Sequence, residues 1–446
     1  MVGGPLAALT PRVEMARHLG AEQILAIGHG RGTGDLPDAR DAVSIVVPPG
    51  AVADIGAQFT ADEELISSPP EVLCRAIDEF DPAGRAVVFA LPMLGPLPGA
   101  MHGRPIVGHR TAAWCALEDK LVVGDIWHEA GVAHVPCEIV TADPPSLRQA
   151  AERLDRGDGT VWAADATQGW HGGAEGTRWV RTAEDADEAL GALMARAEQV
   201  RVMPFIEGIP CSVMGMVFPS GVAALRPVEN VVLRAHTAPV FRYGGVASWW
   251  DPPPDDREVM MAAARRVGAV LAQRWSYRGA FTVDGILGAD GFVPTELNPR
   301  IGASAIQFQR AAPNLPIEMF NRALIADVPC QVDPAEFEAE IRPVLDAHRV
   351  GGSWIEAQVG GHATERHALR YDHGGFRRAR PGETPDATLI AGPGIGGGRI
   401  EFRPGEGLLP TGTSVAPFAV AAFRWADEVL GTRIGFLTPA RDLRRP

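Results

Sequence analysis

The chain has 446 residues, of which 46% are hydrophobic and 22% charged, and it carries a formal net charge of −14 at pH 7. This length predicts two or three domains, and the negative charge argues against nucleic acid or an anionic membrane as a partner. No apolar run reaches the roughly 18–20 residues of a membrane span, and the first residues lack the basic and apolar regions of a signal peptide. We therefore expect a cytoplasmic protein, and a homodimer is left open.

Two residue types stand out by their number or placement. The five cysteines are scattered and never form a CxxC pair, which indicates free thiols rather than a zinc site or disulfides. Lysine occurs once, at Lys120, although Lys and Arg together number 41. The only ammonium side chain among so many guanidinium groups makes this position a candidate for function.

The first 105 residues have the pattern of a small Rossmann-like α/β unit. Short β-rich runs at 23–27, 43–47 and 87–92 predict three strands, and the apolar spacing at 71–80 predicts a helix. The sequence GHGRGTG at 28–34 also suggests a dinucleotide loop, and with it an NAD-dependent enzyme. However, this loop runs into LPDAR and does not open an apolar-periodic helix, so a flexible turn is favoured.

Beyond the Pro- and Gly-rich break at 92–105, the chain alternates between helical and strand patterns. The periodicity predicts a long helix over 111–130 and another over 258–275. A change of texture near 331 indicates a separate C-terminal α+β domain. The fold class is therefore α/β and α+β, with three expected domains at 1–105, 106–330 (including a subdomain at about 120–200) and 331–446.

The stretch VDGILGADGFVPTELNPRIGAS at 283–304 predicts a β-hairpin. A three-residue loop closed by Gly291 in the left-handed region places Asp284 opposite Glu296, with Asn298 on the same face. A two-residue loop would instead put Asp284 on the other face. Facing carboxylates are unfavourable unless a cation neutralises them, and all-oxygen ligands suit Mg²⁺ held against phosphates. The competing interpretation is a solvated hairpin decorated with charges.

Asp284 followed by Glu296, Asn298 and Arg300 resembles the metal-binding signature of the ATP-grasp ligases. This resemblance implies an ATP-grasp fold preceded by a Rossmann-like domain and followed by a small α+β domain. It also implies ATP and Mg²⁺ as cofactors, with two metal ions on the ATP phosphates and Mn²⁺ as a substitute. In that family, the two carboxylates and the Asn hold the metal, and Arg300 would stabilise the transferring phosphoryl group or the oxyanion.

Other motifs of the family fall in the same order along residues 106–325. Lys120 precedes Gly131 by eleven residues and stands where the family has its first nucleotide lysine. Residues 203–208, MPFIEG, resemble the adenine hinge. This likeness implies adenine pairing by the Pro204 carbonyl and the Ile206 N–H, with Phe205 and Ile206 as apolar pocket residues. A glycine-rich lid loop over the phosphates is implied for His171, Gly172, Gly173, Ala174, Glu175, Gly176 and Thr177.

Two positions depart from the family pattern. The second nucleotide lysine is replaced by a residue among Ala163, Ala164 and Asp165, which leaves His171 or Arg178 as substitutes. The carboxylate that binds ribose would fall near Pro210, so this contact is either absent or made by Glu207.

The resemblance implies activation of a carboxylate by phosphorylation, attack of an amine on the acyl phosphate, and release of ADP and phosphate. For a peptide ligase the substrates would be an amino acid and the N-terminus of a peptide or another amine. The segment at 227–254, which contains Glu229, Tyr243, Trp249 and Trp250, either lines an acceptor groove or places its tryptophans in the core. Two further functions are left open: a small-molecule kinase, and a nucleotide-binding protein without ligase chemistry.

Overall fold

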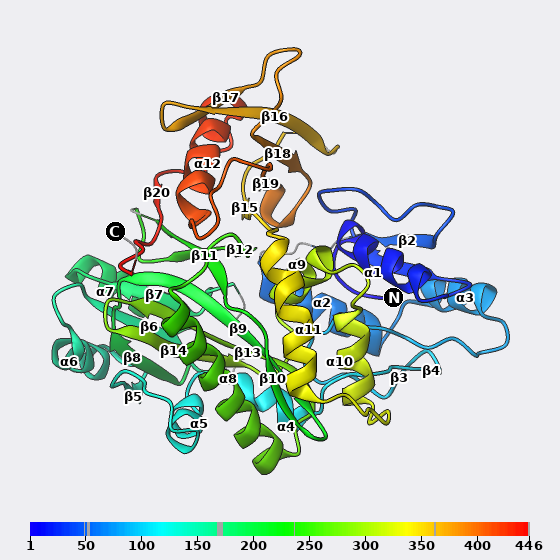
Figure 1. Ribbon diagram of the computed structural model, residues 1–446, viewed down its shortest axis with the longest axis horizontal. Coiled ribbons are helices and arrows are strands. Elements are labelled where there is room, and N and C mark those ends of the chain that lie inside the picture. Colours follow the sequence, from blue (N-terminus) through cyan, green and yellow to red (C-terminus); the bar gives the residue numbers. More distant parts are fainter. Residues whose placement is uncertain (49, 51–53, 167–172, 236, 361–362, 445–446) are drawn as a thin grey trace.

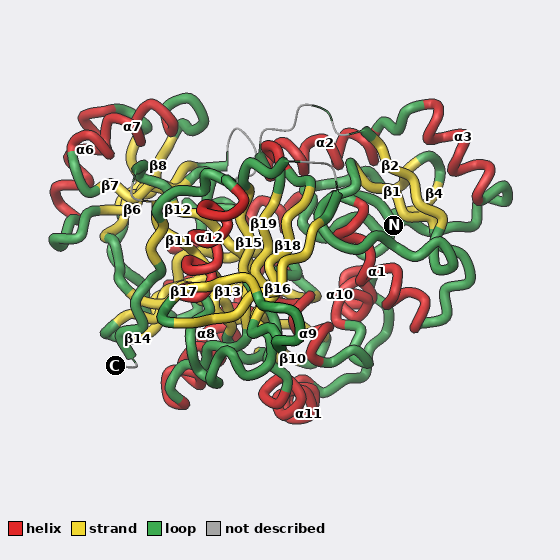
Figure 2. The backbone as a smooth tube through the Cα atoms, turned by 90° about the horizontal axis from the view of Figure 1, so that it is seen from above, coloured by secondary structure: helices red, strands yellow, loops and turns green. Residues whose placement is uncertain are grey.

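The computed structural model describes residues 1–446 except 49, 51–53, 167–172, 236, 361–362 and 445–446 (Figure 1). The molecule has three parts that adjoin one another (Figures 1 and 2). These are the N-terminal elements, two antiparallel sheets from the middle of the chain, and the C-terminal sheet. None of the described helices combines the length and apolarity that a membrane crossing requires.

The N-terminal part is a parallel sheet with helices against it. β1 (Leu25–His29) pairs in parallel with β2 (Val43–Val47), and Val2 forms parallel bridges to Ile27 and Ala90. The predicted strand at 87–92 is wrong, because only bridges form there. Further elements are α1 (Leu6–His18), α2 (Ile55–Ser67), α3 (Glu71–Phe80, as predicted), β3 (Ala100–Met101) and β4 (Arg104–Pro105).

The Rossmann-like unit begins at Val2, earlier than the sequence pattern indicated. α1 follows this residue directly and buries Leu6, Leu9 and Val13 against the sheet. The close approach requires Gly28 in β1, since a Cβ there would lie 2.6 Å from the Leu6 nitrogen. The GHGRGTG loop leads from β1 to β2 without opening a helix, which removes the structural context for a dinucleotide loop.

The helix expected over 111–130 is broken into three pieces: α4 (Ala112–Cys115), the 3₁₀ turn η1 (Ala116–Glu118) and α5 (Val123–Glu129). The Asp119 Oδ1 accepts a hydrogen bond from the Leu121 N–H over 2.9 Å, which competes with helical bonding at this point. Lys120 therefore lies in a turn between η1 and α5, and not on the face of a continuous helix.

The middle of the chain forms two antiparallel sheets. The smaller has the order β5-β8-β6-β7, with α6 and α7 sharing its core. The larger has the order β12-β11-β9-β13-β14, with β10 on β9 and β20 on β11. The bounds are β5 (Glu138–Thr141), α6 (Pro144–Leu154), β6 (Thr160–Ala164), β7 (Thr177–Val180), α7 (Ala183–Leu193), β8 (Gln199–Pro204), β9 (Gly208–Phe218), β10 (Gly221–Ala224), β11 (Val228–Ala235), β12 (Phe241–Ala247), α8 (Pro254–Trp275), β13 (Gly279–Gly288), β14 (Gly291–Asn298) and β20 (Leu437–Thr438).

Helices pack against both faces of the larger sheet. α8 buries Met260, Ala264 and Val267 in a cluster with Val213 and Phe281. The opposite side is covered by α9 (Ser304–Ala311), α10 (Ile317–Ile325) and α11 (Pro334–Ala347). The sheet is therefore buried on both faces, which explains why β9 reads as an almost continuous apolar run.

The C-terminal sheet is also antiparallel, with the order β15-β19-β18-β16-β17, and α12 packs against it. Its elements are β15 (Ser353–Glu356), β16 (Glu365–Asp372), β17 (Gly375–Arg378), β18 (Ala387–Gly392), η2 (Ile395–Gly397), β19 (Arg399–Pro404) and α12 (Ala416–Leu430). β15 lies beside β12, so one edge of this sheet reaches the larger middle sheet (Figure 1).

Candidate active site

A cavity of about 1080 Å³ lies where the three parts of the molecule meet. It is lined by residues of β6 and β8, of the hairpin β13–β14, and of β15 and β19. The GHGRGTG loop also lines it, and the Thr33 Oγ1 donates a 2.7 Å hydrogen bond to the Pro393 carbonyl. This loop therefore connects the N-terminal part to the C-terminal sheet at the cavity wall.

The hairpin β13–β14 brings Asp284 opposite Glu296, as predicted, but through a different geometry. Gly288 pairs with Gly291, so the loop has two residues and the predicted three-residue loop is wrong. The register then shifts next to Asp284, which leaves Thr295 as an extra residue of β14. A two-residue loop alone would put Asp284 on the opposite face from Glu296. The β-bulge shifts the register by one residue and returns Asp284 to the face of Glu296. Gly291 has the expected positive φ, at +112°.

The bulge is fixed from both sides. A Cβ at Gly285 would lie 2.4 Å from the Val293 carbonyl oxygen and 2.5 Å from the Phe292 ring, so only glycine fits there. On the other strand, the Thr295 carbonyl accepts a 2.8 Å hydrogen bond from Arg201. A side chain from β8 therefore holds the bulge that sets the register of the hairpin.

Asn298 links Asp284 to Arg300. Its Nδ2 donates to the Asp284 Oδ2 over 2.9 Å, and its Oδ1 accepts a 3.0 Å hydrogen bond from Arg300. The Glu118 Oε1 in turn lies 2.5 Å from the Arg300 Nε and 3.1 Å from the Arg110 Nη1. This chain of contacts gathers the predicted residues at one end of the cavity and fixes their orientation.

One oxygen of the Asp284 carboxylate is left without a partner. No residue that the structure describes lies in hydrogen-bonding geometry with its buried Oδ1. Burial, followed by the charge of Glu296, raises the pKa of Asp284 to about 6, although Ser212, Arg300 and Asn230 oppose the rise. A cation against Oδ1 would satisfy this oxygen and offset the repulsion.

The donor set at this point fits a hard divalent cation. Asp284, Glu296 and Asn298 can offer two carboxylates and one amide oxygen from a single rigid hairpin. Within the described ranges, no three His, Cys, Asp or Glu side chains gather into a metal-binding group. The amide of Asn298, or oxygens of a ligand, would therefore have to complete the coordination shell.

Lys120 reaches the same end of the cavity. Its Nζ lies 3.1 Å from the Glu296 Oε1, and the side chain is 14% exposed. The turn that breaks the predicted helix directs this ammonium group toward the hairpin. The sequence prediction that Lys120 and Glu296 act at one site is thus consistent with their direct contact in the structure.

Arg201 is a cavity residue that the sequence did not single out. It lies on β8 directly opposite Ala163 of β6, a position at which this chain lacks the second lysine of the family pattern. Its guanidinium donates to the Lys120 and Thr295 carbonyls over 2.9 and 2.8 Å. Its buried Nε has no partner among the described residues. Arg178, a predicted substitute, pairs with Trp162 and is not among the residues that line the cavity.

The predicted adenine hinge lies at the end of β8. Phe205 and Ile206 line the cavity, as expected for apolar pocket residues, whereas Pro204 and Glu207 do not. The Phe205 ring stacks on Trp179 with centroids 4.3 Å apart.

Glu207 has a different set of contacts from those expected of a ribose ligand. It forms a two-point ion pair with Arg234, with both distances 2.7 Å. Burial raises the pKa of Glu207, but the hydrogen bonds from Arg234 and from the Arg441 N–H outweigh this effect and lower it overall. The carboxylate is thus already paired, which argues against the predicted ribose contact.

The predicted lid loop lies partly outside the described residues, which exclude His171 and Gly172. Gly173, Ala174 and Thr177 line the cavity. Glu175 points elsewhere: its Oε1 accepts a 3.0 Å hydrogen bond from the Ile55 N–H at the start of α2. The carbonyl of Gly176 accepts from the Ala164 N–H and joins the end of the loop to β6.

The segment at 227–254 contributes both core and cavity residues. Trp250 is fully buried, as expected for a core tryptophan, whereas Trp249 and Tyr243 line the cavity. Glu229 is buried beneath α12, where it accepts hydrogen bonds from the Ser414 hydroxyl and the Val415 N–H. It therefore has a structural role at the start of α12 and is not a groove residue.

Comparisons with known proteins bear on the fold. No protein-family model and no curated protein sequence matches the chain. Among solved structures, N5-carboxyaminoimidazole synthase from Aspergillus clavatus, in complex with ADP and 5-aminoimidazole ribonucleotide, superposes with a TM-score of 0.50 and 14% identity over 96% of this chain and 97% of that one. Pyruvate carboxylase from Rhizobium etli gives 0.54 and 15% over 98% of this chain and 38% of that one. The fold is the ATP-grasp fold.

A third solved structure, an L-amino acid ligase from Bacillus licheniformis, gives a TM-score of 0.47 and 15% identity over 90% of this chain and 92% of that one. At these identities, the likeness concerns backbone architecture. The predicted fold class is confirmed, with a Rossmann-like part before the two antiparallel sheets and a small α+β part after them.

Proposed function

We propose that this ATP-grasp chain is an ATP-dependent carboxylate–amine ligase. The observation that carries the proposal is the meeting of Asp284, Glu296 and Asn298 with Lys120 and Arg300 at one end of a large cavity. The partnerless Oδ1 of Asp284 supports a cation at this point. An acidic hairpin flanked by two cationic side chains is suited to binding a metal–nucleotide complex.

In this proposal, Asp284, Glu296 and Asn298 would hold two Mg²⁺ ions, and Mn²⁺ could substitute for them. The bound metal would neutralise the β- and γ-phosphates of ATP and polarise the phosphorus that is transferred. Lys120 binds the phosphates, and Arg201 supplies the positive charge that Ala163 cannot. Arg300, held by Glu118 and Asn298, is placed to stabilise the transferring phosphoryl group or the oxyanion of the tetrahedral intermediate.

The adenine would lie against Phe205 and Ile206 and pair with the Ile206 N–H, whereas the predicted pairing by the Pro204 carbonyl is not supported, because Pro204 does not line the cavity. Gly173, Ala174 and Thr177 would cover the phosphates from the side of β6 and β7. We further propose that the predicted domains at 1–105, 106–330 and 331–446 each contribute one wall, because residues from all three ranges line the cavity. Exclusion of water by these walls would protect an acyl phosphate from hydrolysis.

The finer proposal is a peptide ligase in which an amino acid supplies the activated carboxylate and a peptide supplies the amine. The order of motifs resembles that of the peptide ligase of pheganomycin biosynthesis, which suggests a role in natural-product assembly. A volume of about 1080 Å³ is large enough for a nucleotide together with small substrates.

The nucleotide products test this function. Turnover with ATP, Mg²⁺ and a pool of amino acids and short peptides should release ADP and phosphate, which ion-exchange chromatography separates from AMP and pyrophosphate. Release of AMP would reject phosphoryl transfer and indicate adenylation. ADP release accompanied by a stable phosphate ester would assign the chain to the small-molecule kinases.

Lys120→Arg is expected to impair turnover nearly as much as Lys120→Ala, by about 100-fold or more. The reason is that the extended guanidinium fork cannot follow the phosphate as the compact ammonium group does. ADP release per enzyme, measured at saturating ATP, checks this expectation. An Arg variant with wild-type turnover would mean that charge alone is needed at this position.

A further inference from the structure

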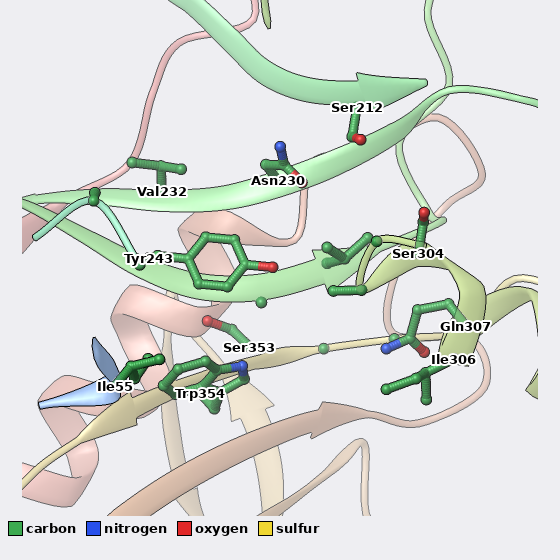
Figure 3. A pocket seen from close by; sticks show the side chains of 18 of the residues that line it. Ile55, Ser212, Asn230, Val232, Tyr243, Ser304, Ile306, Gln307, Ser353 and Trp354 are labelled. Carbon is green, nitrogen blue, oxygen red and sulfur yellow. The ribbon is translucent and has the colours of Figure 1, made fainter. Parts of the chain in front are cut away.

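One half of the cavity wall is formed by β12, β15, β19 and α9. Figure 3 shows Tyr243 of β12 and Ser353 and Trp354 of β15 beside one another, with Ser304 and Gln307 of α9 across the pocket. The proposed nucleotide site uses none of these side chains. They belong to segments far apart in the sequence, so the fold alone brings their polar groups together.

Several polar atoms in this half have no partner. The Ser304 Oγ, Gln307 Oε1, Ser353 Oγ and Glu356 Oε2 are buried, and no described residue forms a hydrogen bond with them. Native proteins satisfy about 90% or more of buried polar groups, so unpaired polar atoms on two facing walls of a cavity indicate a polar ligand. The cluster offers hydroxyl donors together with amide and carboxyl acceptors.

Arg399 is the cation of this region. Its guanidinium lies over the Trp354 ring, 3.9 Å from the centroid, which fixes its orientation. Within the described part of the chain, no acceptor forms a hydrogen bond or ion pair with this guanidinium. The neighbouring carboxylate of Glu401 is instead paired with Arg403 at 2.8 Å. Glu401 and Glu356 interact with Arg399 through their charges but form no ion pair with it. A partly buried arginine whose N–H groups are not taken up by a carboxylate is well suited to bind one from a ligand.

Tyr243 relates this region to the metal hairpin. Its ring makes an edge contact with Trp354, with centroids 5.9 Å apart. Burial raises the pKa of the Tyr243 phenol, as does the charge of Asp284, while Arg300 and Arg399 oppose the rise. The phenol therefore interacts electrostatically with groups of both regions.

We infer that Arg399 binds a free carboxylate of the amine-bearing substrate, which is an amino acid or a short peptide. The inference rests on the proposed ligase function and names the second substrate of that site. The Gln307 Oε1 and the Glu356 Oε2 would accept hydrogen bonds from the N–H groups of the same substrate. Its amine would then extend past Tyr243 toward the acyl phosphate at the hairpin.

Glu356 is compatible with an anion nearby. Burial raises its pKa to about 7, although Arg399 opposes the rise. A carboxyl group that protonates close to neutral pH repels a neighbouring carboxylate less than a fully ionised one does. The region can therefore hold an anion at Arg399 without full repulsion from Glu356.

Two assays on the full-length protein test the inference. The first measures hydroxamate from ATP, Mg²⁺, hydroxylamine and pooled amino acids, which reports activation of the first carboxylate only. The second measures turnover with two sets of amine substrates. One set contains the twenty common amino acids and glycine-containing dipeptides as free acids, and the other contains the same compounds as C-terminal amides. The wild type should have a KM about 10- to 100-fold lower for the free acids than for the amides.

Arg399→Gln should remove this preference and leave hydroxamate formation within about twofold of the wild type. Arg399→Lys should restore part of the preference, which guards against misfolding as the cause. Arg377→Gln is the matched control, since Arg377 is ion-paired with Glu383 in the same sheet and does not line the cavity. This control should behave as the wild type does.

Three results would overturn the inference. One is a wild type with no preference for free acids. Another is an Arg399→Gln variant that retains the preference. The third is loss of hydroxamate in that variant, which would assign Arg399 to the activated carboxylate instead. Absence of both hydroxamate and ADP with the wild type would contradict the ligase function itself, and it is distinguishable from these results.

Discussion

Glu296→Gln is expected to lower turnover by about 100- to 1000-fold, because the loss of one carboxylate weakens metal binding to the phosphates by several kcal/mol in the transition state. The substitution also weakens the 3.1 Å contact with Lys120, which leaves the ammonium group less well placed. The fold should persist, since the side chain is 30% exposed and the amide has the same shape. ADP release at saturating ATP and Mg²⁺ measures the effect.

The matched control is Asp290→Asn in the loop of the same hairpin. Asp290 is exposed and does not line the cavity, so its loss should leave turnover within about twofold of the wild type. If Glu296→Gln behaves like this control, the acidic hairpin is a solvated surface feature and the proposed site is wrong.

Asp284→Asn is expected to abolish turnover and, at the same time, to stabilise the ligand-free protein. Turnover should fall because the partnerless Oδ1 is a proposed metal ligand. Stability should rise because the variant removes a buried charge that faces Glu296; a pKa raised from 3.8 to about 6 corresponds to a cost of about 3 kcal/mol. A higher Tm together with lost ADP release is the expected pair of observations.

The stabilisation by Asp284→Asn should depend on pH. The pKa of Asp284, about 6 in the folded chain, lies above the ordinary value of 3.8. The folded state therefore binds a proton that the unfolded state does not, so this group's contribution destabilises the fold above pH 6 and fades as the pH falls toward 4. The Tm advantage of Asp284→Asn should be largest above pH 6 and shrink below it. An advantage that is constant with pH would reject the buried charge as its cause.

The position of Asp284 shows how a correct prediction can rest on an incomplete argument. The alternation of residues placed Asp284 opposite Glu296 only for a three-residue loop. The structure has a two-residue loop, and the bulge at Thr295 restores the pairing. The bulge depends on the space at Gly285 and on the hydrogen bond from Arg201, both of which are tertiary contacts. No local pattern in the hairpin sequence contains this information.

Arg201 could not be predicted for a similar reason. Because the strand with Ala163 lacks the second lysine, His171 or Arg178 was predicted as the second phosphate-binding cation. The structure places a guanidinium group on the neighbouring strand, opposite Ala163. Only the register between β6 and β8 makes these positions neighbours. By contrast, Lys120 could be found because its rarity and its distance from Gly131 are properties of the sequence itself.

At the N-terminus, the class of the unit could be predicted but not its beginning. The strand patterns at 23–27 and 43–47 are visible because they are continuous and β-branched. Val2 contributes single bridges, and α1 contains Pro11, so neither has a clear periodic signal. The glycine loop at 28–34 attracted attention as a nucleotide motif, whereas the structure uses it to contact the C-terminal sheet through Thr33.

The central claim is that a carboxylate is activated by phosphorylation in this cavity. Incubation of the protein with ATP, Mg²⁺, hydroxylamine and pooled amino acids tests it most directly, with hydroxamates identified by mass spectrometry and ADP measured in parallel. The account predicts hydroxamate of a free amino acid together with ADP, and no hydroxamate with Glu296→Gln. AMP in place of ADP, or ADP with a stable phosphate ester and no hydroxamate, would contradict it.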